Sequence, residues 1–126
     1  MDGKEKLEQF LNYLRIVDKQ IDEELQPYYE KVLEREKAGM NSYGVANPKE
    51  RVLLGKSSSI YKLQAKINAC SSFEELEAKL KGEIAETQDN AILYDLQRQL
   101  NLISEYLISV EKTVSANDEF GGFKKR

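Results

Sequence analysis

The chain has 126 residues, of which 40% are hydrophobic and 33% are charged, and its net charge is −3. This length gives one domain, and the composition is typical of a globular helical protein and too apolar for a disordered one. No segment is long and apolar enough to cross a membrane, and the single cysteine, Cys70, excludes an intrachain disulfide. We therefore expect a cytoplasmic protein with no membrane partner.

The first predicted helix spans residues 4–37, because its apolar residues recur every three or four positions. Pro27 removes one hydrogen bond of this helix, so we expect a kink or a break next to it. Gly39 follows the helix and suits its C-terminal cap. The apolar stripe of this segment comprises Leu7, Phe10, Leu14, Val17, Ile21, Leu25, Tyr28 and Val32.

A second helix is predicted after a loop over residues 39–47. Asn47 is a good N-terminal cap, Pro48 suits the first helical position, and Glu50 can complete a capping box. The helix should run to about residue 70. Gly55 and the serines at 57–59 weaken it, so the sequence leaves open whether it is continuous.

Two more helices complete the predicted fold. The third begins near Ser72, and residues 87–90 separate it from the fourth, which we expect to end near Ala116. The fourth helix carries an apolar stripe with alternating spacings of three and four, which must be buried against other helices. That stripe comprises Leu93, Leu96, Leu100, Ile103, Leu107, Val110 and Val114.

Together these elements predict an all-α fold. We expect an antiparallel bundle of about four helices with a long, kinked N-terminal helix. Residues 1–116 should form the single helical domain, and residues 117–126 a flexible, basic C-terminal tail.

The residue types that most enzymes need are scarce in this chain. It has no histidine, which removes the commonest general base and the commonest transition-metal ligand. One cysteine cannot supply a zinc site, and Cys70 suits a half-buried position better than a reactive one. The acid pairs Glu74–Glu77 and Glu86–Asp89 are too close in sequence to face each other from two helices. We predict no catalytic residue, metal or cofactor, and a magnesium-dependent all-α hydrolase is the least favoured class.

A basic island interrupts an otherwise acidic chain, since residues 49–66 hold five basic residues and one acidic residue. Cations along a helix suit contacts to nucleic-acid phosphates, and a tyrosine can stack on a base. The interpretation that we favour is that these cations pair with acidic residues of the first and third predicted helices. The candidate nucleic-acid contacts are Lys49, Arg51, Lys56, Tyr61, Lys62 and Lys66.

The fourth predicted helix also carries apolar residues outside its stripe. Tyr94, Leu102 and Ile108 lie on the far side, where a helix packed on one face only would be polar. Either this helix is central, with neighbours on both sides, or it presents these residues to a partner. We expect a non-enzymatic helical subunit or adaptor that binds another protein chain, or a second copy of itself, through these three residues. The alternative is a small subunit of a nucleoprotein complex that contacts phosphates through residues 49–66.

Overall fold

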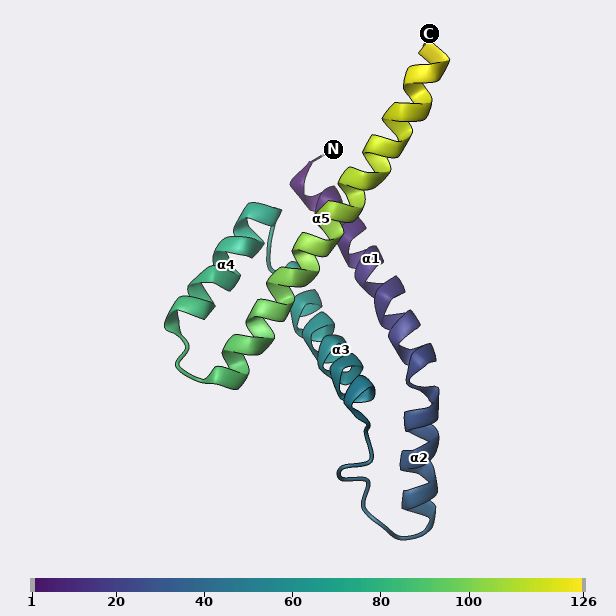
Figure 1. The fold of residues 1–126 in the computed structure, drawn as a ribbon. Coiled ribbons are helices and arrows are strands. Elements are labelled where there is room, and N and C mark those ends of the chain that lie inside the picture. The colour runs from purple at the N-terminus through teal and green to yellow at the C-terminus, as the bar shows by residue number, and fades with distance from the viewer. Residues whose placement is uncertain (1, 126) are drawn as a thin grey trace.

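A computed structural model describes the backbone of residues 2–125 and the side chains of residues 2–112 (Figure 1). Within residues 2–125 all regular structure is helical, which confirms the all-α prediction. None of the described helices is both long and apolar enough to cross a membrane. The helices are α1 (Gly3–Glu24), α2 (Gln26–Lys37), α3 (Pro48–Ile67), α4 (Phe73–Glu86) and α5 (Asn90–Lys125).

The predicted N-terminal helix is divided into α1 and α2 at Leu25. Pro27 lies in the first turn of α2, where its missing N–H costs no helical hydrogen bond. The side chain of Leu25 is fully buried, so the break is fixed by packing as well as by the proline. A kink or a break was expected here, and the helix breaks. The long, kinked N-terminal helix of the predicted fold is therefore two helices, and the described chain has five helices where about four were expected.

Local sequence signals set most of the other helix ends. Gly39 follows α2 with a φ of 72°, a conformation that glycine adopts without strain. Asn47 and Glu50 form the predicted capping box at the start of α3. The hydroxyl of Ser72 accepts a hydrogen bond from the backbone N–H of Glu75 and caps α4.

The helix α3 is continuous through the segment that weakened its prediction. The Ser57 hydroxyl donates to Asp18 of α1 at 2.8 Å, and the Ser59 hydroxyl donates to Asp95 of α5 at 2.5 Å. Gly55 lies against the guanidinium group of Arg98, where a Cβ atom would come within 2.1 Å of Nη1. Contacts with two neighbouring helices therefore stabilise this weak segment of α3.

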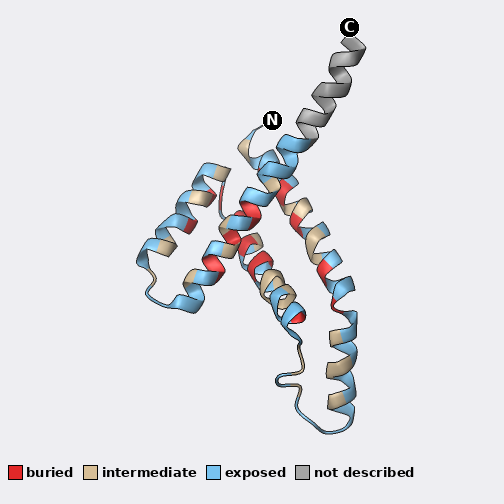
Figure 2. Ribbon diagram, in the orientation of Figure 1, coloured by how far each residue is buried: buried red, intermediate tan, exposed pale blue. Residues whose placement is uncertain are grey.

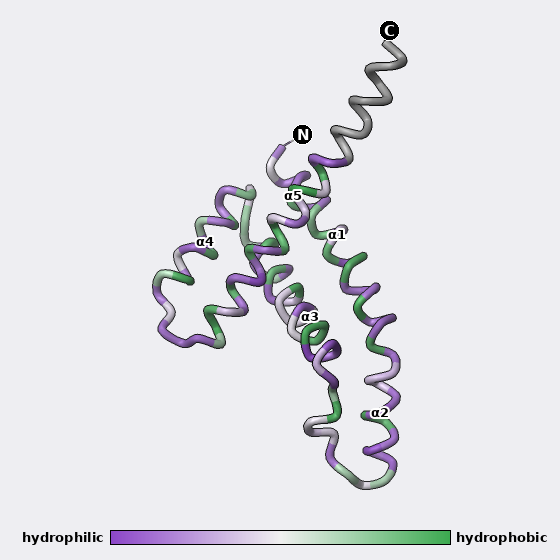
Figure 3. Tube along the Cα trace, viewed as in Figure 1, coloured by the Kyte–Doolittle hydropathy of each residue, from purple (hydrophilic) through white to green (hydrophobic). Residues whose placement is uncertain are grey.

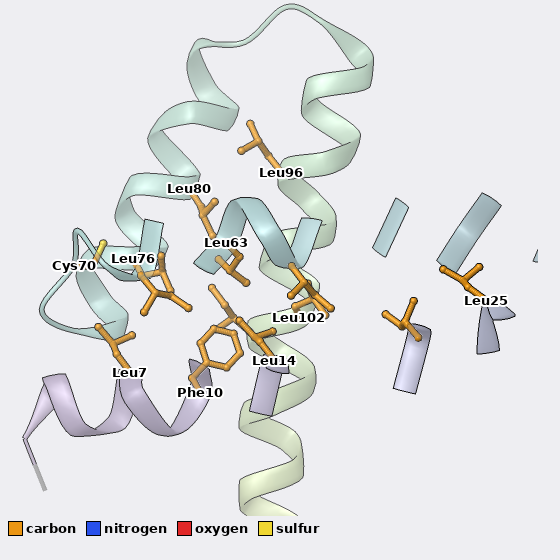
Figure 4. Close-up of a cluster of buried hydrophobic side chains, with 14 residues drawn as sticks. Leu7, Phe10, Leu14, Leu25, Leu63, Cys70, Leu76, Leu80, Leu96 and Leu102 are labelled. Atoms are coloured by element: carbon orange, nitrogen blue, oxygen red, sulfur yellow. The ribbon is translucent and has the colours of Figure 1, made fainter. Parts of the chain in front are cut away.

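The core lies where α1, α3, α4 and α5 meet, and buried positions line their facing sides (Figure 2). Hydrophobic and hydrophilic residues alternate along each helix, as expected for amphipathic helices (Figure 3). Phe10 lies between Leu7 and Leu14, and Leu25 lies at one edge of the same cluster (Figure 4). No residue of α2 is fully buried.

Two faces of α5 are buried in the core, so one predicted contact residue needs correction. Leu96 and Ile103 belong to the predicted stripe and are buried, and Leu102 is buried as well, at 2% exposure. Leu102 was expected to contact a partner chain, but it is a core residue because α5 has neighbours on both sides. The central position of α5, one of the two interpretations of the sequence, is thus confirmed for this part of the helix.

The far end of α5 extends beyond the expected limit. The helix runs to Lys125, past the predicted end near Ala116. The side chains of residues 113–126 lie outside the described residues, so the flexible, basic tail over residues 117–126 stays a prediction.

Candidate functional site

Aromatic side chains from three helices meet at one end of the core. The ring of Phe10 lies 4.9 Å from that of Tyr106 and 5.4 Å from that of Phe73, measured between centroids. Tyr13 approaches Tyr106 at 5.0 Å. Burial raises the pKa of both tyrosines above its ordinary value of 10.0. This cluster fixes the starts of α1 and α4 against α5.

A groove of about 770 Å³ opens beside this aromatic cluster, between the starts of α1 and α4 and the middle of α5. Gly3 lies against the Ser71 carbonyl, where a Cβ atom would come within 2.6 Å, so the start of α1 is held close to the α3–α4 connection. We call this site the α5 groove. Its lining residues are Gly3, Lys6, Gln9, Ser72, Phe73, Glu74, Glu77, Tyr106, Leu107 and Val110.

Two residues of the α5 stripe, Leu107 and Val110, line the α5 groove and are exposed. Leu107 is 39% exposed and Val110 is 41% exposed, although both continue the spacing that buries Leu96 and Ile103. The stripe extends beyond the helices that cover it, because α1 and α4 both begin beside this part of α5 (Figure 1). Sequence reasoning assigned Leu107 and Val110 to the core. The signal for their exposure is that the stripe is longer than the predicted helices that could cover it.

The structure does not bring the three predicted protein contacts together. Ile108 is 51% exposed and lies near the α5 groove, whereas Tyr94 is exposed near the other end of the core. Fourteen helical positions separate them, which corresponds to about 21 Å. The Tyr94 ring lies under the Arg98 guanidinium, 4.9 Å from its centroid. Ile108 follows Leu107 in the chain, but neither Ile108 nor Tyr94 is among the residues that line the groove.

A second candidate region is a polar network between α3, α4 and α5. The carboxylate of Asp95 is buried and accepts hydrogen bonds from Ser59 at 2.5 Å, Gln99 at 2.9 Å and Lys62 at 3.3 Å. Burial alone would raise the pKa of Asp95, but these hydrogen bonds outweigh it and hold the pKa below its ordinary value. Lys66 extends the network by donating to Gln99 at 2.9 Å. The network joins the helices through satisfied polar groups.

Most of the basic island pairs with acidic residues inside the chain. Lys66 lies 2.7 Å from Glu83, Lys62 lies 3.3 Å from Asp95, and Lys56 lies 3.7 Å from Glu105. The favoured interpretation expected acidic partners on the first and third predicted helices. Only the pair of Lys66 with Glu83 of α4 agrees with it, because the partners of Lys62 and Lys56 are on α5, the fourth predicted helix. The remaining candidate nucleic-acid contacts are exposed on α3, and they are Lys49, Arg51 and Tyr61.

No group of three or more acidic or cysteine side chains that could hold a metal ion occurs in the part of the chain that the structure describes. Cys70 is buried, and burial raises the pKa of its thiol, which disfavours the reactive thiolate. The chain matches no known protein family, and no curated protein or solved structure shows significant similarity to it. The geometry of the α5 groove is therefore the main evidence for a function.

Proposed function

We propose that this protein is a non-enzymatic helical module that binds a helix of another protein chain in the α5 groove. The observation that carries the proposal is the exposure of Leu107 and Val110 in the same stripe that buries Leu96 and Ile103. Apolar residues three positions apart are the anchors by which one helix packs against another. The same proposal places the protein in the cytoplasm and gives it an antiparallel helical bundle as its core.

The chemistry of the groove suits a helix with one apolar face. Its floor is formed by the aromatic rings of Phe73 and Tyr106 and by the aliphatic side chains of Leu107 and Val110. Full burial of an exposed aliphatic side chain contributes roughly 1.5–3 kcal/mol, so burial of a half-exposed one contributes about 1 kcal/mol. These contributions favour binding to an apolar helix face.

Site-specific photo-crosslinking in the native source tests the proposal. We expect benzoylphenylalanine at position 107 to yield discrete covalent adducts, and the same group at position 16 to yield none of them. Ile16 is the matched control, because it is 59% exposed but lies on α1 and does not line the groove. The adducts at position 107 should disappear when Val110→Glu is introduced. Equal adduct patterns at positions 107 and 16 would contradict the proposal.

The alternative function is contact with nucleic-acid phosphates through residues 49–66. It is supported by the exposure of Lys49, Arg51 and Tyr61 on α3. It is weakened by the ion pairs of three of the five basic residues of this segment. Binding to single-stranded nucleic acid should fall steeply as salt rises if phosphates are the target, and an absence of binding at low salt would remove this alternative.

A further inference from the structure

We propose that the α5 groove is filled by the C-terminal end of α5 from a second copy of the chain, so that two copies exchange residues 110–126. This inference rests on the proposed function, because it names the helix that the groove binds. Each copy would supply one groove and one inserted segment, which gives a symmetric dimer with two identical contacts.

The first argument is the continuity of the α5 stripe. Its spacing does not change where it leaves the core, since Leu107, Val110 and Val114 follow Ile103 at intervals of four, three and four residues. This repeat is the pattern with which two helices pack side by side. A helix without neighbours is only marginally stable in water, so a partner helix packed beside this part of α5 would stabilise α5. The same segment of a second copy offers Val110 and Val114 at this spacing, and the repeat ends there because its next positions are Asn117 and Gly121.

The second argument is the direction of α5. The helix continues from Val110 to Lys125, which carries the chain about 22 Å along the helix axis. This end points away from the starts of α1 and α4, which border the groove (Figure 1). A continuous helix therefore cannot return its own end to its own groove. A second copy in the antiparallel direction can bring the segment there.

The third argument is charge. Glu74 and Glu77 lie on the α4 side of the groove, and Lys6 lies on the α1 side. Residues 124–126 of the exchanged segment are three consecutive basic residues. These residues are favoured beside the two glutamates, and complementary charge also fixes the orientation of a bound helix.

The fourth argument is the type of the contact. The segment contains Phe120 and Phe123, and aromatic side chains bury large areas against an aromatic floor such as that of Phe73 and Tyr106. A symmetric exchange forms this contact twice, once in each groove.

Sedimentation velocity on the full chain tests the inference, with protein from low micromolar to submillimolar concentration. We expect a dimer of twice the 14.5 kDa chain mass at the higher concentrations. The double variant Glu74→Lys/Glu77→Lys should raise the dissociation constant about tenfold or more, because it places like charges together. Reversing the charges of residues 124–126 to glutamate should have the same effect. The chain that carries both sets of changes should regain the dimer.

The matched control is Glu23→Lys/Glu24→Lys, which makes the same change of charge on exposed residues outside the groove. It should leave the dissociation constant unchanged, and circular dichroism should show that all variants remain helical. A wild-type chain that stays monomeric throughout would overturn the inference, and so would a combined variant that fails to regain the dimer. Photo-crosslinked adducts at position 107 that contain only a foreign chain would also overturn it, while leaving the proposed function intact.

Discussion

Replacing Leu102 by alanine should destabilise the protein strongly, although the sequence placed this residue on the outer side of its helix. The side chain is 2% exposed in the core. The change removes about three buried carbon groups, worth about 0.8 kcal/mol each in transfer free energy, and leaves a cavity. The free energy of unfolding should therefore fall by about 2–5 kcal/mol. The same substitution at Ile108, which is 51% exposed, should change it by less than about 1 kcal/mol.

Urea denaturation followed by helical circular dichroism measures both values on the same scale. The slope of the free energy against urea should be unchanged, so the difference appears in the transition midpoint. In thermal unfolding the Leu102→Ala variant should lose roughly 10 °C or more, at about 3–6 °C per kcal/mol for a chain of this size. Leu102→Met keeps the volume and should cost less than about 1.5 kcal/mol. Equal, small losses for Leu102→Ala and Ile108→Ala would refute the burial of Leu102 and the central position of α5.

Two further predictions concern backbone conformation and buried charge. Gly39→Ala should lower the free energy of unfolding by about 1 kcal/mol, because its φ of 72° strains any residue with a Cβ atom. Gly82→Ala in the open middle of α4 should raise the free energy of unfolding by about 0.5–1 kcal/mol. Thermal unfolding measures both variants, and midpoints that shift in the same direction would contradict the prediction. The lowered pKa of Asp95 means that its ionised form stabilises the fold above the ordinary pKa of 3.8 and that this contribution is lost as the pH falls below it. The gap in unfolding free energy between wild type and Asp95→Asn should therefore narrow from about pH 6 to about pH 3 in urea titrations, and a constant gap would show that Asp95 contributes no acid dependence.

The ends of the helices follow from local sequence. The capping box of Asn47 and Glu50, the break before Pro27 and the glycine at position 39 all depend on residues within one turn of each other. Such contacts are made by the chain with itself over a few residues, so they can be predicted without knowledge of the fold. The continuity of α3 could not be predicted, because Ser59 is held by Asp95 on a distant helix.

The ion pairs of the basic island also depend partly on the sequence and partly on contacts between distant helices. The sequence indicated that these lysines would meet acidic residues, since the rest of the chain is acidic. It did not indicate which ones, because Lys66 meets Glu83 and Lys62 meets Asp95 only when α3 lies against α4 and α5. A count of charges carries no information about which helices are neighbours.

Sequence by itself determined that this protein is helical and where the apolar faces of its helices lie, because a period of 3.6 residues is a property of one helix. Only the tertiary structure decided which parts of those faces are covered. Leu102 is buried although it lies outside the predicted stripe, and Leu107 and Val110 are exposed although they belong to it. The physical reason is that burial depends on where neighbouring helices begin and end, and both α1 and α4 begin beside the middle of α5.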